Sequence, residues 1–361
     1  MAINLATCVT AFLISFVTLP VIIKFFIEKN LVDIPGRRKV HKKITPSMGG
    51  VSIFVGFLLA VLIWMDYGQW ESIRFVLSSL LIIFLLGIRD DIVPFRATHK
   101  LIGQIVAVII FLFSSIYINS LYGLFGINEI PEWVSYALTG FVIIIITNSF
   151  NLIDGLDGLA GSIGMVALTA FGVWFYLAGD SLFSLICFAM MGGILAFLVF
   201  NWEPSEIFMG DTGAMMIGML LAMLVIHFMM VNSTLPPSSP VKYSATIGSA
   251  VCFIIVPLSD TLRIIILRIM KGKSPFVPDK SHIHHAIMRL GFTHSKTSAL
   301  LASVNGVFIV AAWVFRDYGD KWVLPGVIAV CMILSLIIDR LIIRSLLSKQ
   351  YQDSEASDLE T

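Results

Sequence analysis

The chain has 361 residues, of which 58% are hydrophobic and only 13% are charged, and its formal net charge is +1. Its mean hydropathy is +0.93. Charged residues make up about 25% of a typical soluble domain, so this composition excludes an ordinary soluble globular protein. Apolar runs of about 20 residues recur along the whole sequence, which indicates a single polytopic membrane domain.

Apolar runs between charged residues and Pro/Gly breaks predict an all-α protein with about eleven transmembrane helices. The loops that follow the odd-numbered spans carry most of the Lys and Arg residues. Cytoplasmic loops are enriched in these residues, so we expect the N-terminus outside and the C-terminus in the cytoplasm. The expected spans are 5–27, 48–65, 73–88, 101–120, 133–150, 160–178, 181–200, 212–231, 245–267, 297–315 and 323–345.

Three short acidic motifs lie at the ends of predicted spans, all on the cytoplasmic side. Asp90 and Asp91 follow the third span, Asp154 and Asp157 follow the fifth, and Asp211 precedes the eighth. A carboxylate near lipid is costly, so several at one face indicate a bound divalent cation or a phosphate-bearing substrate. Taken singly, each motif also fits a solvated helix end, a turn or a helix cap.

The second and third acidic motifs carry further polar groups. Asn151 opens the sequence NLIDGLDG, in which two Asp residues three positions apart would share one face of a helical turn. Asn201 and the FMGDTG motif join the seventh and eighth spans. Asp211 in that motif would stand at the positive end of a helix dipole, where it could bind Mg²⁺ or simply cap the helix.

The longest cytoplasmic loop contains His282, His284 and His285 within four residues, beside Lys280. No cysteine is nearby and the spacing fits no standard zinc pattern. Histidines beside basic residues suit an anionic diphosphate better, so we interpret this loop as a cover over a phosphate site.

Two other charged groups have a mainly structural interpretation. The basic run 37–43 after the first span is explained largely by topology and contact with anionic lipid, with Lys42 the best candidate to face a substrate phosphate. Asp260 and Arg263 are three residues apart in the ninth span and are interpreted as an ion pair.

In combination, these motifs resemble the polyprenyl-phosphate N-acetylhexosamine-1-phosphate transferase family, which includes MraY, WecA and TagO. The resemblance runs from about residue 33 to residue 292. It rests on TP-x-MGG at the second span, the adjacent Asp pair, NLIDGLDGL, FMGDTG and PDKSHIHH. The HIHH form is similar to the WecA/TagO branch, which uses UDP-GlcNAc, and less similar to the MraY branch.

The resemblance implies a role for each matching residue. Asp90 and Asp91 correspond to the catalytic pair, and Asp211 corresponds to the ligand of Mg²⁺, with Mn²⁺ as the alternative ion. Phe208 is expected to stack on uracil. The full set implied for nucleotide-sugar binding is Lys42, Asn151, Asp154, Asp157, Asn201, Phe208, His282, His284 and His285.

The resemblance also implies the reaction and its setting. The expected enzyme transfers GlcNAc-1-phosphate from UDP-GlcNAc to undecaprenyl phosphate and releases UMP, the first lipid-linked step of cell-envelope glycan synthesis. Its expected partners are these substrates and the lipid bilayer, with no nucleic acid, and a homodimer is left open. Residues 1–347 would form one catalytic domain in the bacterial inner (plasma) membrane, with the active site facing the cytoplasm, and 348–361 a disordered tail.

Two other functions would leave different patterns in the sequence. A transporter would place its acidic residues at mid-span and show repeated broken helices in two matching halves, whereas the acids here lie at one interface. A CDP-alcohol phosphotransferase would need a D-G-x₂-A-R signature, which DGLDGLA lacks.

Overall fold

The computed structural model describes residues 1–29, 45–272, 274 and 282–359. Throughout these ranges the regular elements are helical. The α-helices are α1 (Ala2–Glu28), α2 (Gly49–Trp64), α3 (Trp70–Ile92), α4 (Ala97–Leu112), α5 (Glu132–Ile153), α6 (Leu159–Ala178), α7 (Ser181–Asn201), α8 (Gly210–Thr234), α9 (Thr246–Phe253), α10 (Ile255–Met270), α11 (Ile283–Arg289), α12 (His294–Val314) and α13 (Asp320–Leu359). Two short 3-10 helices, η1 (Tyr67–Gln69) and η2 (Leu124–Gly126), lie in connections.

The expectation of an all-helical polytopic protein is confirmed. Eight helices in the described ranges are long and apolar enough to cross a membrane. The bent pair α9–α10 and the shorter apolar helices α2 and α4 fall on the three remaining predicted spans. The exact number of spans and the sides on which the termini lie stay predictions.

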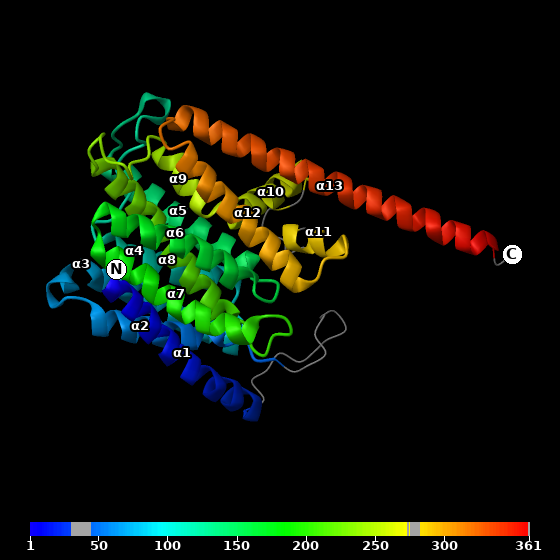
Figure 1. The fold of residues 1–361 in the computed structure, drawn as a ribbon, viewed down its shortest axis with the longest axis horizontal. Helices are drawn as coiled ribbons and strands as arrows, with labels where there is room; N and C mark the ends of the chain where they lie inside the picture. The colour runs from blue at the N-terminus through cyan, green and yellow to red at the C-terminus, as the bar shows by residue number, and fades with distance from the viewer. Residues whose placement is uncertain (30–44, 273, 275–281, 360–361) are drawn as a thin grey trace.

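Helix α8 lies at the centre of the bundle, and α13 lies at its edge (Figure 1). The most apolar stretch of α8 is 89% buried, whereas that of α13 is 0% buried and leaves its apolar side chains to lipid. Helices α3 and α5 both pack against α8. This packing brings the C-terminal ends of α3 and α5 to the first turn of α8.

Helix α13 continues to Leu359 and leaves the bundle at its C-terminal end, drawn in red in Figure 1. The helix therefore extends into 348–361, where the sequence predicts a disordered tail. The division into one membrane domain and a tail stays a prediction.

The ninth predicted span is broken into two helices, α9 and α10, which meet at 91°. Pro257 in the first turn of α10 has no N–H to give to the carbonyl of Phe253, four residues earlier. Asn305 of α12 bonds the backbone groups that the break leaves without a helical partner. Its Nδ2 donates to Phe253 O at 3.0 Å, and its Oδ1 accepts from Val256 N at 3.3 Å. The bend redirects α10 toward α13 and α11.

Side chains tie the redirected helix to its neighbours. Arg263 of α10, which the sequence suggested as the partner of Asp260, reaches α13 instead. Its Nε donates to Ser335 Oγ at 2.8 Å, and its Nη2 pairs with Asp339. Asp260 is left to contact the segment at the start of α11, which packs in turn against α12 and α13.

Candidate active site

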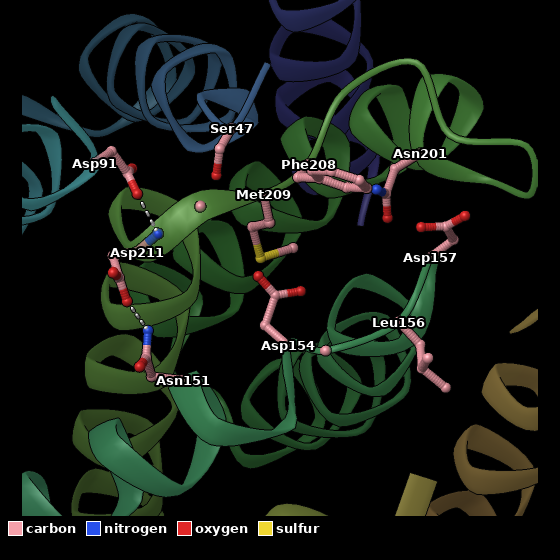
Figure 2. A pocket seen from close by; sticks show the side chains of 12 residues that line it. Ser47, Asp91, Asn151, Asp154, Leu156, Asp157, Asn201, Phe208, Met209 and Asp211 are labelled. Atoms are coloured by element: carbon pink, nitrogen blue, oxygen red, sulfur yellow. Dashed lines mark hydrogen bonds between the residues drawn. The ribbon is translucent and has the colours of Figure 1, made fainter. Parts of the chain in front are cut away.

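The acidic motifs meet at one end of the bundle, around a cavity of about 310 Å³ (Figure 2). The cavity lies where the ends of α3 and α5 meet the start of α8, and its volume is in the range of small-ligand pockets. The predicted convergence of the three acidic motifs is thus present in the structure. The lining residues are Ser47, Asp91, Asn151, Asp154, Gly155, Leu156, Asp157, Asn201, Phe208, Met209, Gly210 and Asp211.

Asp91 caps the start of α8 from a different helix. Its Oδ1 accepts from Asp211 N at 2.8 Å, and its Oδ2 accepts from Thr212 N at 3.0 Å and from Thr212 Oγ1 at 2.5 Å. The first N–H groups of a helix have no partner inside it, and a carboxylate there also interacts favourably with the helix dipole. Asp91 therefore fixes the end of α3 to the first turn of α8.

The approach of Asp91 to α8 requires the glycine that precedes Asp211. Gly210 has φ of +73°, a conformation that L side chains rarely adopt. A Cβ at this position would lie 2.4 Å from Ser47 O and 2.6 Å from Asp91 Oδ2. The glycine of FMGDTG thus lets three chain segments meet at the edge of the cavity.

Lys100 of α4 lies between two of the predicted acidic residues. Its Nζ is 2.5 Å from Asp90 Oδ2 and 3.1 Å from Asp211 Oδ2. The other oxygen of Asp90 accepts from Phe95 N at 2.6 Å, and the other oxygen of Asp211 accepts from Asn151 Nδ2 at 2.6 Å. The Asp90 side chain is only 3% exposed, so its charge is held almost entirely by these two contacts.

Asp154 points into the cavity from the loop after α5 (Figure 2). Burial, and after it the negative charges of Asp211, Asp91 and Asp157, raise the pKa of this carboxyl to about 7. Asp154 is therefore the carboxyl most ready to exchange a proton, or its charge, with a ligand at neutral pH.

Asp157 and Asn201 form the opposite wall of the cavity. Both ends of the Asn201 amide bond backbone groups. Its Oδ1 accepts from Gly158 N at 2.8 Å, and its Nδ2 donates to Ile207 O at 2.8 Å. Asp157 Oδ2 lies 3.4 Å from Nδ1 of His294 at the start of α12. These contacts hold the acidic loop against the connection between α7 and α8 and against the start of α12.

Phe208 stands at the cavity wall with its backbone fixed on both sides. Its N–H donates to Pro46 O at 2.8 Å, and its carbonyl accepts from Gly49 N at 2.9 Å. The TP-x-MGG segment thus pairs with the FMGDTG segment and presents the ring to the cavity (Figure 2).

The three histidines lie next to one another behind the acidic loop. The rings of His282 and His284 are stacked with centroids 5.6 Å apart, and those of His284 and His285 are 4.3 Å apart. His284 contacts the loop at Gly155, where an added Cβ would be 2.6 Å from the imidazole Nε2. Lys42, the remaining predicted site residue, lies outside the described residues.

Sequence reasoning missed three members of this arrangement: Lys100, His294 and Asp260. From the sequence Lys100 contributes only to the positive charge of a cytoplasmic loop, and it lies on α4, the helix after the one that carries the Asp pair. His294 lies just beyond the histidine loop, and Asp260 was assigned to Arg263. A polar side chain near a cytoplasmic helix end was the available signal in each case.

The donor chemistry of the cavity fits a hard divalent cation. Among the described residues, no group of three His, Cys, Asp or Glu side chains is already arranged as a metal site. The Lys100 ammonium, however, bridges Asp90 and Asp211, so the site already holds one positive charge between carboxylate oxygens. Carboxylate oxygens are the ligands that Mg²⁺ prefers.

Comparisons with known proteins show the family to which the chain belongs. The family model of glycosyl transferase family 4 matches residues 73–229. A Bacillus subtilis (strain 168) protein named "Probable undecaprenyl-phosphate N-acetylglucosaminyl 1-phosphate transferase" is 31% identical over 86% of this chain and 85% of its own length. The undecaprenyl-phosphate alpha-N-acetylglucosaminyl 1-phosphate transferase of Escherichia coli (strain K12) is 32% identical, over 89% of this chain and 88% of its own.

An all-helical membrane fold with an acidic, lysine-bridged pocket at one end defines a polytopic glycosyl-phosphate transferase. The chain belongs to the polyprenyl-phosphate N-acetylhexosamine-1-phosphate transferase family.

Proposed function

We propose that this enzyme transfers GlcNAc-1-phosphate from UDP-GlcNAc to undecaprenyl phosphate, releasing UMP and forming undecaprenyl-diphospho-GlcNAc. The relatives named above carry this activity in their names and match most of the chain. The observation that carries the proposal is the single pocket in which Asp91, Asp154 and Asp211 converge beside Lys100. A site that brings two anionic phosphates together needs positive charge to offset their repulsion and carboxylates that position this charge.

In the proposed reaction, an oxygen of the lipid phosphate attacks the sugar-proximal phosphorus in line, and the bond to UMP breaks. Lys100 contacts both Asp90 and Asp211 and is suited to offset charge on the reacting phosphates. Asp154, which faces the cavity with a pKa of about 7, is suited to accept the proton of the lipid phosphate.

We propose that Asp90 and Asp91, the pair to which the resemblance gives a catalytic role, position other groups of the site. Asp90 holds Lys100, and Asp91 holds the first turn of α8 and with it Asp211. Both carboxylates would thus act by fixing the groups that meet the substrates, because orientation supplies a large part of phosphoryl-transfer catalysis.

The family generally uses a divalent metal ion, which we propose to be Mg²⁺, with Mn²⁺ as a substitute. Asp211 would hold the ion. When bound, it would supply charge neutralisation for the diphosphate and the departing UMP.

The other wall of the pocket is proposed to hold the nucleotide sugar. The Phe208 ring lines the pocket and is suited to stack on uracil. Asp157 supplies a polar group on the loop after α5, and Asn151 supplies one in the last turn of α5. Asn201 supports this wall through its two backbone contacts. The histidines behind Gly155 are proposed to serve the diphosphate and sugar, together with Lys42.

The site is proposed to face the cytoplasm of the bacterial inner membrane, because the basic loops lie on the same side as the acidic motifs. We further propose that residues 1–347 act as one catalytic domain. Single cysteines introduced at Glu206, in the α7–α8 connection, and at Asp317, between α12 and α13, test the orientation in a cysteine-free background. An impermeant thiol reagent applied to intact cells should label only position 317.

The reaction itself is tested with purified protein, UDP-[¹⁴C]GlcNAc, undecaprenyl phosphate and Mg²⁺, with UMP and labelled lipid as readouts. Wild type should form both products in equal amounts, and Asp211→Asn should lose most of the activity. The matched control is Asp317→Asn, an exposed carboxylate at the far end of α12, which should retain full activity. If wild type forms no labelled lipid, the proposed function is wrong; if Asp211→Asn keeps full activity, only the role of Asp211 is wrong.

A further inference from the structure

A buried carboxylate outside the acidic pocket holds one of the three histidines. Asp260 of α10 is only 2% exposed at its side chain. Its Oδ2 lies 2.8 Å from Nδ1 of His282, and its Oδ1 accepts from Ile283 N at 2.8 Å. A buried carboxylate is tolerated when hydrogen bonds satisfy both of its oxygens, as they do here.

This contact fixes which ring nitrogen of His282 carries a proton. An ionised carboxylate only accepts hydrogen bonds, so the Nδ1 that faces it must be the protonated nitrogen. In the neutral ring Nε2 is then the acceptor. The backbone contact to Ile283 holds the segment that carries the ring, so Asp260 sets both the tautomer and the position of His282.

The arrangement continues from His282 to the acidic pocket. The His282 and His284 rings are nearly parallel, with 11° between their planes. His284 is 1% exposed and contacts Gly155, which lines the cavity beside Asp154. Burial lowers the pKa of His284 to about 3, and the nearby His285 acts in the same direction, so this ring packs as a neutral group.

The bend between α9 and α10 places Asp260 where it can make this contact. The carboxylate lies one turn beyond the Pro257 break that Asn305 stabilises, on the helix that turns by 91° toward α11. The broken span therefore has a use: it supplies an anchor for the histidine segment from a helix that also packs against α5.

We propose that Asp260 is a positioning residue for the transferase reaction. By fixing the tautomer and orientation of His282, it holds the histidine segment against the acidic loop at Gly155. This inference rests on the proposed function, since it assigns the histidines to the same site. For histidines that bind a metal, replacing the group that orients the imidazole typically changes activity by about 10- to 100-fold, and we expect the same scale for His282.

The decisive variant is Asp260→Asn. The side-chain oxygen of Asn can still accept from Ile283 N, which turns its NH₂ group toward His282 Nδ1 and drives the imidazole proton to Nε2. We expect kcat to fall by about 10- to 100-fold, with the KM for each substrate within about twofold of wild type and the protein still folded. The control is Asp339→Asn, which removes the carboxylate partner of Arg263 on the same helix and should leave kcat unchanged.

A double-mutant comparison separates positioning from a general packing effect. Asn at position 282 can keep a donor near Asp260 but lacks the Nε2 edge, so His282→Asn should fold and lose kcat to a similar extent. In that background Asp260→Asn should cause no further loss. The inference would be overturned if either single variant kept the wild-type kcat. It would also be overturned if the loss of kcat in the double variant equalled the product of the two single losses. If Asp260→Asn fails to fold, the ring-protonation measurement below, made on wild type and His282→Asn, decides it.

A measurement that needs no turnover distinguishes this inference from the proposed function. In ¹⁵N spectra of histidine-labelled protein, the ring signals of His282 are assigned as those that are lost in His282→Asn. In wild type, these signals should show a proton at Nδ1. The Asp260→Asn substitution should move that proton to Nε2. An Nε2-protonated ring in wild type overturns the positioning role, whatever substrate the enzyme uses; an inactive wild type with the expected spectrum overturns only the reaction.

Discussion

The ammonium group of Lys100 lies 2.5 Å from Oδ2 of Asp90, a carboxylate that is almost fully buried. Because Asp90 also accepts from the backbone at Phe95, its position is fixed, and the lysine is held by a rigid partner. The ammonium group of Lys100 is thereby held close to Asp211, with Nζ 3.1 Å from Oδ2. A lysine on a flexible stem becomes a preorganised positive charge.

Replacing Lys100 with Met should lower turnover and raise metal affinity at the same time. Turnover should fall by about 10²-fold, the usual scale for loss of one preorganised charged group at a reacting centre. Affinity for divalent cations should rise, because the ammonium that competes for Asp211 is gone. UMP release and calorimetric titration with Mn²⁺ measure the two effects. Lys321→Met, at the start of α13, is the control and should alter neither.

Asp91→Ala should destabilise the protein through the start of α8. The substitution removes three hydrogen bonds, from Asp211 N, Thr212 N and Thr212 Oγ1. Loss of a helix-capping side chain costs about 1–2 kcal/mol, so the thermal midpoint in detergent should fall, and Asp91→Asn should fall less. Asp317→Ala serves as the exposed control. A midpoint equal to that of wild type in Asp91→Ala would rule out the capping role.

The pKa of Asp154 predicts how stability depends on pH in metal-free protein. The folded-state pKa of about 7 lies above the value of about 3.9 expected for an unfolded Asp. Near pH 4 and below, the carboxyl is protonated in the folded state and its burial costs little. As the pH rises toward 7 the unfolded chain ionises first, so the free energy of unfolding decreases through this window.

Thermal midpoints measured between pH 5 and pH 8 test this sign. Wild type should lose stability with rising pH, and Asp154→Asn should show a shallower decline because it has no proton to lose at this position. A saturating divalent cation should also reduce the decline in wild type, since it offsets the negative charges of Asp211, Asp91 and Asp157. Identical slopes in wild type and Asp154→Asn would contradict the assignment.

The membrane architecture could be predicted from sequence because each span is a local property. An apolar run must form a helix to satisfy its own backbone in lipid, whatever its neighbours are. The acidic motifs could be assigned to one end by counting spans. Pro257 is a local signal for a break in the helix, but the 91° bend could not be predicted, because the side chain that satisfies it, Asn305, lies about fifty residues later in the chain.

The pairing of polar side chains between helices could not be predicted from the sequence either. Asp260 and Arg263 share a helical face in sequence, but the bend turns α10 so that one contacts His282 and the other contacts α13. His227 stands alone in an apolar stretch of the sequence, but its Nε2 lies 2.6 Å from Oδ2 of Asp180, which is 47 positions earlier. Such pairs depend on which helices are neighbours, which the apolar pattern does not specify.

Phe208→Ala should raise the KM for UDP-GlcNAc by about tenfold or more while leaving the KM for undecaprenyl phosphate unchanged. Stacking of a base on an aromatic ring contributes about 1–3 kcal/mol, and the Phe208 ring is fixed for this purpose by the backbone contacts to Pro46 and Gly49. Truncation should leave these backbone contacts, so the protein should remain folded. Phe208→Tyr, which keeps an aromatic face, should remain close to wild type. Equal increases in both KM values would instead assign the ring to the shape of the whole pocket.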